Sequence, residues 1–96
     1  MNDIAVRDAI RRFILSSCLP DEPAEALPDD LALRTSGILD SFATMGLVDF
    51  IRRQFDVELD VYDMSVERFN RIDEMAAVVR QKRGDPRDVL ATAPGR

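Results

Sequence analysis

Apolar residues recur at the spacing of a helix face in three parts of this chain, separated by stretches rich in proline and aspartate. The first part predicts a helix over residues 3–17, with Asp3 placed to cap it and an apolar stripe made of Val6, Ile10, Phe13 and Ile14. The last predicts a helix over residues 72–83, whose apolar face consists of Ile72, Met75, Ala76 and Val79. Gly84 and Pro86 then end that helix.

The middle pattern predicts a second helix over residues 41–54, and a step of about 100° per residue divides it into two faces. The face predicted to be core consists of Ala43, Leu47, Val48, Phe50, Ile51 and Phe55. The outer face consists of Phe42, Met45, Gly46, Asp49, Arg52 and Arg53. Phe42 and Met45 are therefore two large apolar residues among charges. Either a neighbouring loop or short helix covers them, or they form a docking patch for a partner.

The remaining segments contain prolines or turn-forming residues. Pro20, Pro23 and Pro28 exclude a continuous helix, so we expect a long ordered loop from residue 18 to 39, with at most one short turn in it. The residues that would anchor this loop in the core are Leu27, Leu31, Leu33 and Ile38. A short helix is expected over residues 65–69. The predicted fold is all-α, a small four-helix bundle of three main helices and one short helix, in a single domain over residues 1–83. Residues 84–96 are expected to be a disordered tail.

Composition excludes several functions. The chain has 96 residues, 18 acidic and 13 basic side chains and a net charge of -5, which argues against nucleic-acid binding. Its apolar runs are too short to span a bilayer, and its charged start does not resemble a signal peptide, so we expect a cytoplasmic monomer. With no histidine, Ser41 cannot belong to a Ser-His-Asp hydrolase. A single cysteine, Cys18, excludes an internal disulfide and argues against zinc, and we expect a packed or half-packed thiol.

Ser41 lies where the second helix begins, and the residues alone allow two readings of it. Asp40 or Ser41 could simply cap the helix, as such residues often do. Alternatively, Ser41 could be the attachment point of a phosphate group, because free N–H groups and the helix dipole favour an anion at this end. The charge of Asp40 acts against a phosphate at this position.

A wider set of residues gives the chain a resemblance to a known family. The residues that carry it are the run GILDSF from Gly37 to Phe42, Asp29, Asp30 and Leu33 upstream, and Phe55, Val57 and Phe69 downstream. In this register the chain resembles the acyl carrier proteins and the related peptidyl and aminoacyl carrier domains, over roughly residues 4 to 83. Phe42 stands at the third position of the family's Asp-Ser-Leu-type tripeptide.

The resemblance implies that Ser41 receives a 4′-phosphopantetheine arm from coenzyme A, whose terminal thiol holds an acyl or aminoacyl group as a thioester. The carrier itself would not be an enzyme. Its partners would be a phosphopantetheinyl transferase, a loading ligase and downstream biosynthetic enzymes. Asp40 would help to recruit the transferase and its magnesium, and partners would grip the carrier at Phe42 and Met45, beside the arm.

The outer face of the second helix departs from the family's pattern. Many fatty-acid carriers have a strongly acidic helix there, whereas this chain has Arg52 and Arg53 next to Asp49, and Gly46 at a place that is often acidic. Because rim charges chiefly set encounter rate and partner choice, the chain is more similar to a freestanding carrier of a specialised aminoacyl, polyketide or nonribosomal peptide pathway. The arginine pair could equally be a solvated face.

A second function from a different class stays open. The chain could be an unmodified, carrier-like helical docking subunit that binds a protein partner through Phe42 and Met45. Ser41 would then be only a helix cap. The two hypotheses differ in one expectation, because Ser41→Ala abolishes carrier function but leaves a docking module able to bind.

Overall fold

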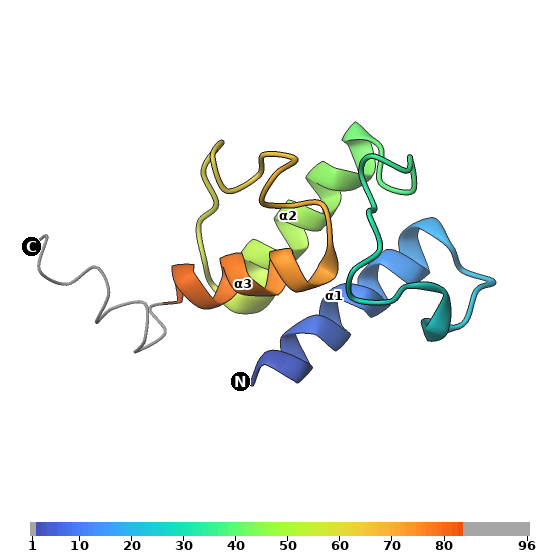
Figure 1. Cartoon of the computed structure of the whole chain (residues 1–96). Helices are drawn as coiled ribbons and strands as arrows, with labels where there is room; N and C mark the ends of the chain where they lie inside the picture. The colour runs from blue at the N-terminus through green and yellow to red at the C-terminus, as the bar shows by residue number, and fades with distance from the viewer. Residues whose placement is uncertain (1, 84–96) are drawn as a thin grey trace, which may run out of the picture.

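The computed structural model describes residues 2–83, which form three α-helices and contain no strand (Figure 1). The helices are α1 (Asp3–Cys18), α2 (Ser41–Phe55) and α3 (Ile72–Lys82), and a 3-10 helix, η1 (Ala24–Ala26), lies between the first two. The predicted all-α class is confirmed, and all three main helices begin and end within one residue of the predicted positions. The tail predicted over residues 84–96 lies outside the described residues.

The predicted cap of α1 is wrong by one residue. Asn2, not Asp3, is the N-cap, and its side-chain oxygen accepts a hydrogen bond of 2.7 Å from the Ala5 N–H. Asp3 lies in the first turn of α1, where it pairs with Arg7 at 2.7 Å and with Arg80 of α3 at 3.2 Å. Asp3 therefore connects α1 to α3 instead of ending the helix.

The core is formed by the apolar stripes of the three helices together with apolar residues of the connecting segments. Side chains with no exposed surface are Ile10, Ile14, Leu27, Leu33, Leu47, Ile51, Phe69, Ile72, Met75 and Val79. Helix α1 packs against both α2 and α3. Full burial of each such side chain contributes about 1.5–3 kcal/mol, so these stripes are the main reason that the short helices are stable.

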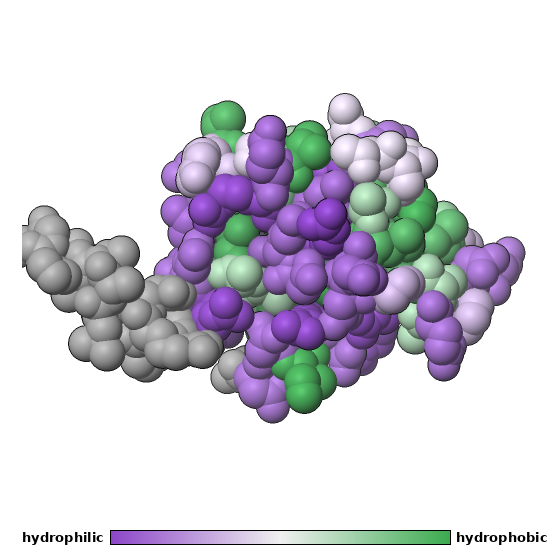
Figure 2. Space-filling model, viewed as in Figure 1, coloured by the Kyte–Doolittle hydropathy of each residue, from purple (hydrophilic) through white to green (hydrophobic). Residues whose placement is uncertain are grey.

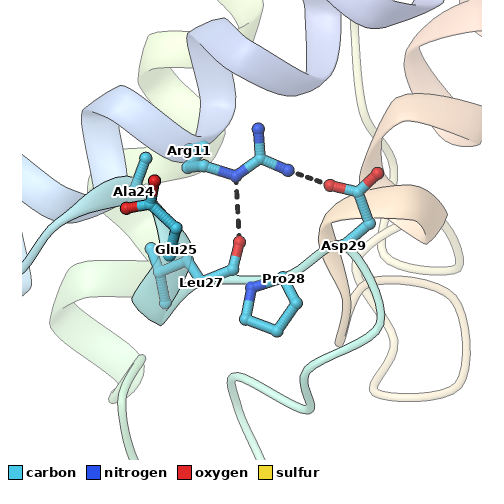
Figure 3. Close-up of a pocket in the computed structure, with 6 residues that line it drawn as sticks. All are labelled: Arg11, Ala24, Glu25, Leu27, Pro28 and Asp29. Atoms are coloured by element: carbon cyan, nitrogen blue, oxygen red, sulfur yellow. Dashed lines mark hydrogen bonds and ion pairs between the residues drawn. The ribbon is translucent and has the colours of Figure 1, made fainter.

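Polar contacts at Asp29 fix the segment between α1 and α2. Its carboxylate accepts hydrogen bonds from Arg7, at 2.8 Å, and from Arg11, while its backbone carbonyl accepts one from the Asp73 N–H at 3.1 Å. Arg11 also donates to the carbonyl of Leu27 at 2.9 Å (Figure 3). The segment is thus tied to α1 and to the start of α3, and this geometry leads the chain to Ser41.

The short helix predicted over residues 65–69 is absent, and the segment forms a series of turns. In an α-helix, the Arg68 N–H would donate to the carbonyl of Met64. Here it donates to the carbonyl of Ser65 at 3.1 Å, while the guanidinium of Arg34 donates to the Met64 carbonyl. The carbonyl that a helix would use thus makes a tertiary hydrogen bond with Arg34, while the Arg68 N–H bonds to a carbonyl one residue nearer in the chain.

An aspartate pair holds the start of the same segment against α3. Asp63 is buried, and its carboxylate accepts hydrogen bonds from the Asp60 N–H at 3.1 Å and pairs with Lys82 at 2.8 Å. Asp60 in turn accepts a hydrogen bond of 2.8 Å from the Asp63 N–H. These bonds hold the pKa of Asp60 below, and that of Lys82 above, their ordinary values; the chief causes are the Asp63 N–H for Asp60 and the Asp63 carboxylate for Lys82.

Candidate functional site

The chain from Gly37 to Ser41 is shaped so that its last residue faces solvent. Gly37 has φ of 89°, a left-handed conformation that suits glycine, and its N–H donates to the Arg34 carbonyl at 3.2 Å in the preceding turn. Leu39 is buried, and its N–H donates to the carbonyl of Leu33 at 2.9 Å. The buried Leu39 fixes the approach to α2, and Ser41, two residues later, is exposed.

Asp40 is the N-cap of α2, which resolves which of the two candidate residues caps the helix. Its Oδ1 accepts a hydrogen bond of 2.8 Å from the Ala43 N–H. Its carbonyl accepts from the Thr44 N–H at 2.9 Å and from the Thr44 hydroxyl at 2.7 Å. Because Asp40 does the capping, the hydroxyl of Ser41 is not needed for it, and Ser41 is the first helical residue.

Asn70, two residues before α3, holds the turn that precedes Ser41. It is buried, and its Oδ1 accepts hydrogen bonds from the N–H groups of Arg34, at 2.8 Å, and Thr35, at 3.2 Å. Its backbone carbonyl accepts another from the Leu33 N–H at 2.8 Å. The position of Ser41 therefore depends on a residue that lies 29 positions later in the chain.

Phe42 and Met45 are exposed on α2, next to Ser41. Phe42 is 89% exposed and Met45 is 60% exposed, so neither is covered by the loop or by the segment before α3. For a phenylalanine this is unusual, since most of its apolar surface stays in water. Of the two alternatives, coverage by any segment within residues 2–83 is excluded, and two large apolar side chains stand exposed beside the serine.

Sequence reasoning missed three further exposed apolar residues, Val61, Tyr62 and Val66, in the segment between α2 and α3. This segment and the start of α2 lie at the same edge of the molecule, the upper edge in Figure 1, and Figure 2 shows hydrophobic residues along that edge of a mostly hydrophilic face. No periodicity distinguishes these residues from core positions. Val61 and Tyr62 lie in the turns at residues 61–64, and only Val66 lies in the range of the expected short helix.

Asp49, Arg52 and Arg53 are brought together farther along the same face of α2. Arg52 pairs with one oxygen of Asp49 at 2.7 Å, and Arg53 pairs with the other at 3.0 Å. The hydrogen bond from Arg52, with a smaller contribution from the charge of Arg53, lowers the pKa of Asp49. All three side chains keep contact with solvent. The cluster has one negative and two positive charges, and Glu58, just beyond the helix, also acts on Arg52 by its charge.

Cys18 is a free, half-buried thiol at the end of α1, as predicted. Burial raises its pKa, and the negative charge of Asp40 raises it further. The thiol is therefore held in its protonated, poorly nucleophilic form at neutral pH.

A surface hollow and the acidic side chains offer no alternative site within residues 2–83. The hollow in Figure 3 is lined by Arg11, Ala24, Glu25, Leu27, Pro28 and Asp29. The guanidinium of Arg11 there already binds Asp8, the Leu27 carbonyl and Asp29, so its donors hold the fold together. Within residues 2–83, no three His, Cys, Asp or Glu side chains are grouped so that they could hold a metal ion.

Comparison with known proteins adds no family to this geometry: no family model, curated protein or solved structure matches the chain. None of the helices described within residues 2–83 has the length and apolar character needed to cross a membrane. The fold and the site together define a small all-α protein that presents an exposed serine at a helix start, beside two exposed apolar side chains and a cationic cluster.

Proposed function

We propose that this protein is an acyl or aminoacyl carrier, which holds biosynthetic intermediates as thioesters on a 4′-phosphopantetheine arm attached to Ser41. The observation that carries the proposal is the setting of Ser41: an exposed hydroxyl at the first residue of α2, capped by Asp40 and flanked by the exposed Phe42. This setting gives a partner enzyme open access to the hydroxyl and an apolar side chain to grip beside it.

The residues present fit the proposed group. The arm is joined when the Ser41 oxygen attacks the β-phosphorus of coenzyme A, which forms a phosphodiester and releases adenosine 3′,5′-bisphosphate, while the serine proton passes to a base on the transferase. The phosphate then lies at the positive end of the α2 dipole. Asp40, whose side chain has one oxygen bonded to the Ala43 N–H, presents a carboxylate next to the reacting serine for the transferase and its magnesium.

The chain's own contribution is presentation, and the chemistry of loading belongs to partner enzymes. The buried Leu39 and the hydrogen bonds of Asn70 hold the approach to Ser41 in one conformation. Because the serine is already held in one conformation, a transferase has less of the chain to order when it binds. A protein with this role needs no histidine, metal or catalytic base.

Intact-mass measurement tests the proposal. The purified protein is incubated with coenzyme A, magnesium and a broad-specificity phosphopantetheinyl transferase, with Ser41→Ala and Ser36→Ala alongside. We expect a gain of one phosphopantetheine in the wild type and in Ser36→Ala, whose hydroxyl is in the preceding turn, and none in Ser41→Ala. A folded wild type that gains no mass with several transferases would contradict the proposal.

A second candidate function is an unmodified helical docking subunit that binds a protein partner through Phe42 and Met45. The exposure of both side chains favours it independently of any modification. In that case Ser41→Ala leaves partner binding unchanged, whereas Phe42→Ala weakens it. The mass experiment separates the two functions, because only the carrier gains the arm.

A further inference from the structure

The outer face of α2 combines an apolar end with a cationic end. Phe42 and Met45 lie in its first turns, and Arg52 and Arg53 lie in its last turn, where both pair with Asp49. We propose that this face docks a protein partner with an acidic contact surface: an apolar pocket takes Phe42 and Met45, and carboxylates at its rim bind the two arginines. The inference rests on the proposed function, since it names the partner class that reaches Ser41.

The geometry of α2 sets the spacing that such a partner must match. Met45 and Arg52 are seven residues apart, which corresponds to about 10 Å along the helix axis. Both lie on the outer side of the helix, because seven residues are close to two full turns. The partner's acidic groups therefore lie about 10 Å from its apolar pocket, in the direction away from Ser41.

The charges on α2 determine whether the rim of the partner's pocket must be acidic or basic. One carboxylate, Asp49, is shared by two guanidinium groups, so each arginine keeps N–H donors that it does not use. These side chains remain well exposed, Arg52 at 53% and Arg53 at 79%. A carboxylate can bind a guanidinium through two parallel hydrogen bonds. An acidic rim would therefore bind the unused N–H groups of the two arginines, whereas a basic rim would repel their charges.

The net charge of the chain bears on how an acidic partner would be oriented on its surface. The protein carries -5 overall, so an acidic partner is repelled at long range and gains attraction only where cations outnumber anions. On α2 itself they do, two to one, while Glu58, just beyond the helix, also acts on Arg52 by its charge. Rim charges chiefly change association rate and salt dependence, so the arginines should act as a selector of partner and orientation, while Phe42 and Met45 supply the buried contact.

Two phosphopantetheinyl transferases serve as probes, one with an acidic and one with a basic rim around its active-site entrance. Binding of the apo-protein is measured by surface plasmon resonance without coenzyme A, at low and high salt, and modification of Ser41 is followed in parallel by mass. The test variant is Arg52→Glu/Arg53→Glu. The matched control, Arg12→Glu/Arg83→Glu, makes the same change in net charge at exposed residues outside α2. In the test variant, two new glutamates join Asp49, so three carboxylates lie close together; a further variant, Arg52→Gln/Arg53→Gln, removes the positive charges without this crowding. Circular dichroism checks that every variant is folded.

We expect the wild type to bind the acidic-rim transferase more tightly at low salt than at high salt. The test variant should lose about tenfold in affinity for it and gain for the basic-rim transferase, while the control changes both by less than about threefold. The glutamine variant should lose affinity for the acidic rim without that gain.

Three results would overturn the docking proposal: equal effects of the test and control variants, stronger binding of the wild type to the basic rim, or no binding of any variant to either transferase. The carrier function stands or falls separately on the mass of Ser41. Modification at rates that do not depend on the α2 charges keeps the carrier and rejects the acidic partner. Charge-dependent binding without modification keeps the docking surface and rejects the carrier.

Discussion

Replacing Asn70 by alanine tests whether one buried side chain holds the approach to Ser41. Its Oδ1 accepts two backbone N–H bonds, from Arg34 at 2.8 Å and from Thr35 at 3.2 Å. A buried N–H left without an acceptor costs about 1–3 kcal/mol. Arg34 is half-buried and Thr35 is exposed, so water can reach the second N–H and only the first carries most of that cost. We therefore expect Asn70→Ala to lower the free energy of unfolding by about 1–3 kcal/mol.

Urea unfolding followed by circular dichroism measures this loss, and thermal unfolding should show a fall in Tm of about 5–20 °C for a domain of this size. Thr35→Ala is the matched control. It removes only the hydroxyl that accepts from the Asn70 amide at 3.3 Å, which water can replace, so we expect a change below about 0.5 kcal/mol. A loss for Asn70→Ala no larger than that of the control would refute the view that Asn70 fixes this turn.

Three further predictions concern the surface. Phe42→Ala should change the free energy of unfolding by less than about 0.5 kcal/mol in urea titrations, because its side chain is 89% exposed, and a larger loss would mean that it packs in the fold. Gly46→Ala should raise stability by about 0.5–1 kcal/mol, since an added Cβ would meet only Phe13, at 3.9 Å, and glycine is unfavourable inside a helix; a loss would indicate a clash. Asp60 has a lowered pKa, chiefly through the Asp63 N–H, so the unfolded chain binds more protons and stability falls as the pH drops through that pKa. Asp60→Asn should flatten this acid slope of the urea midpoint between about pH 6 and 3, and an unchanged slope would assign it to other carboxylates.

The three main helices could be predicted because their signals are local. Each has an apolar stripe at helical spacing, and a proline, glycine or aspartate lies near each of its ends. The ranges agree with the structure to within one residue. Only the capping residue of α1 was misplaced, because Asn2 and Asp3 are both good caps and the sequence does not say which one turns back to the Ala5 N–H.

The expected short helix failed for a reason that local sequence cannot contain. Residues 65–69 have no proline or glycine that forbids a helix. The acceptor that the helix needs, the Met64 carbonyl, is bonded to Arg34, which is 30 residues away in the chain. The turns at Asp60 and Asp63, held by Lys82, further fix the segment in a non-helical path. Tertiary contacts override helix propensity here.

The candidate site likewise has features that follow from local sequence and features that do not. The outer position of Phe42 and Met45 followed from the helix period, and the structure exposes both. The pairing of Arg52 and Arg53 with Asp49 is also local, since the residues are three and four positions apart on one helix. The exposure of Tyr62 was not predictable, because it lies in the turns at residues 61–64, where no helical or strand period marks one face as the outer one.

The setting of Ser41 depends on three segments that are distant in the chain. Asp29 ties the preceding loop to α1 and α3, Asn70 holds the turn at Arg34, and Arg34 in turn binds the segment before α3. These contacts are polar and directional, so each of them fixes a local conformation as well as contributing to stability. The apolar core would survive the loss of any one of them, whereas the approach to Ser41 would not stay in one conformation. A variant such as Asn70→Ala should therefore leave a folded helical protein with a less ordered serine, which separates what holds this fold together from what makes its proposed site usable.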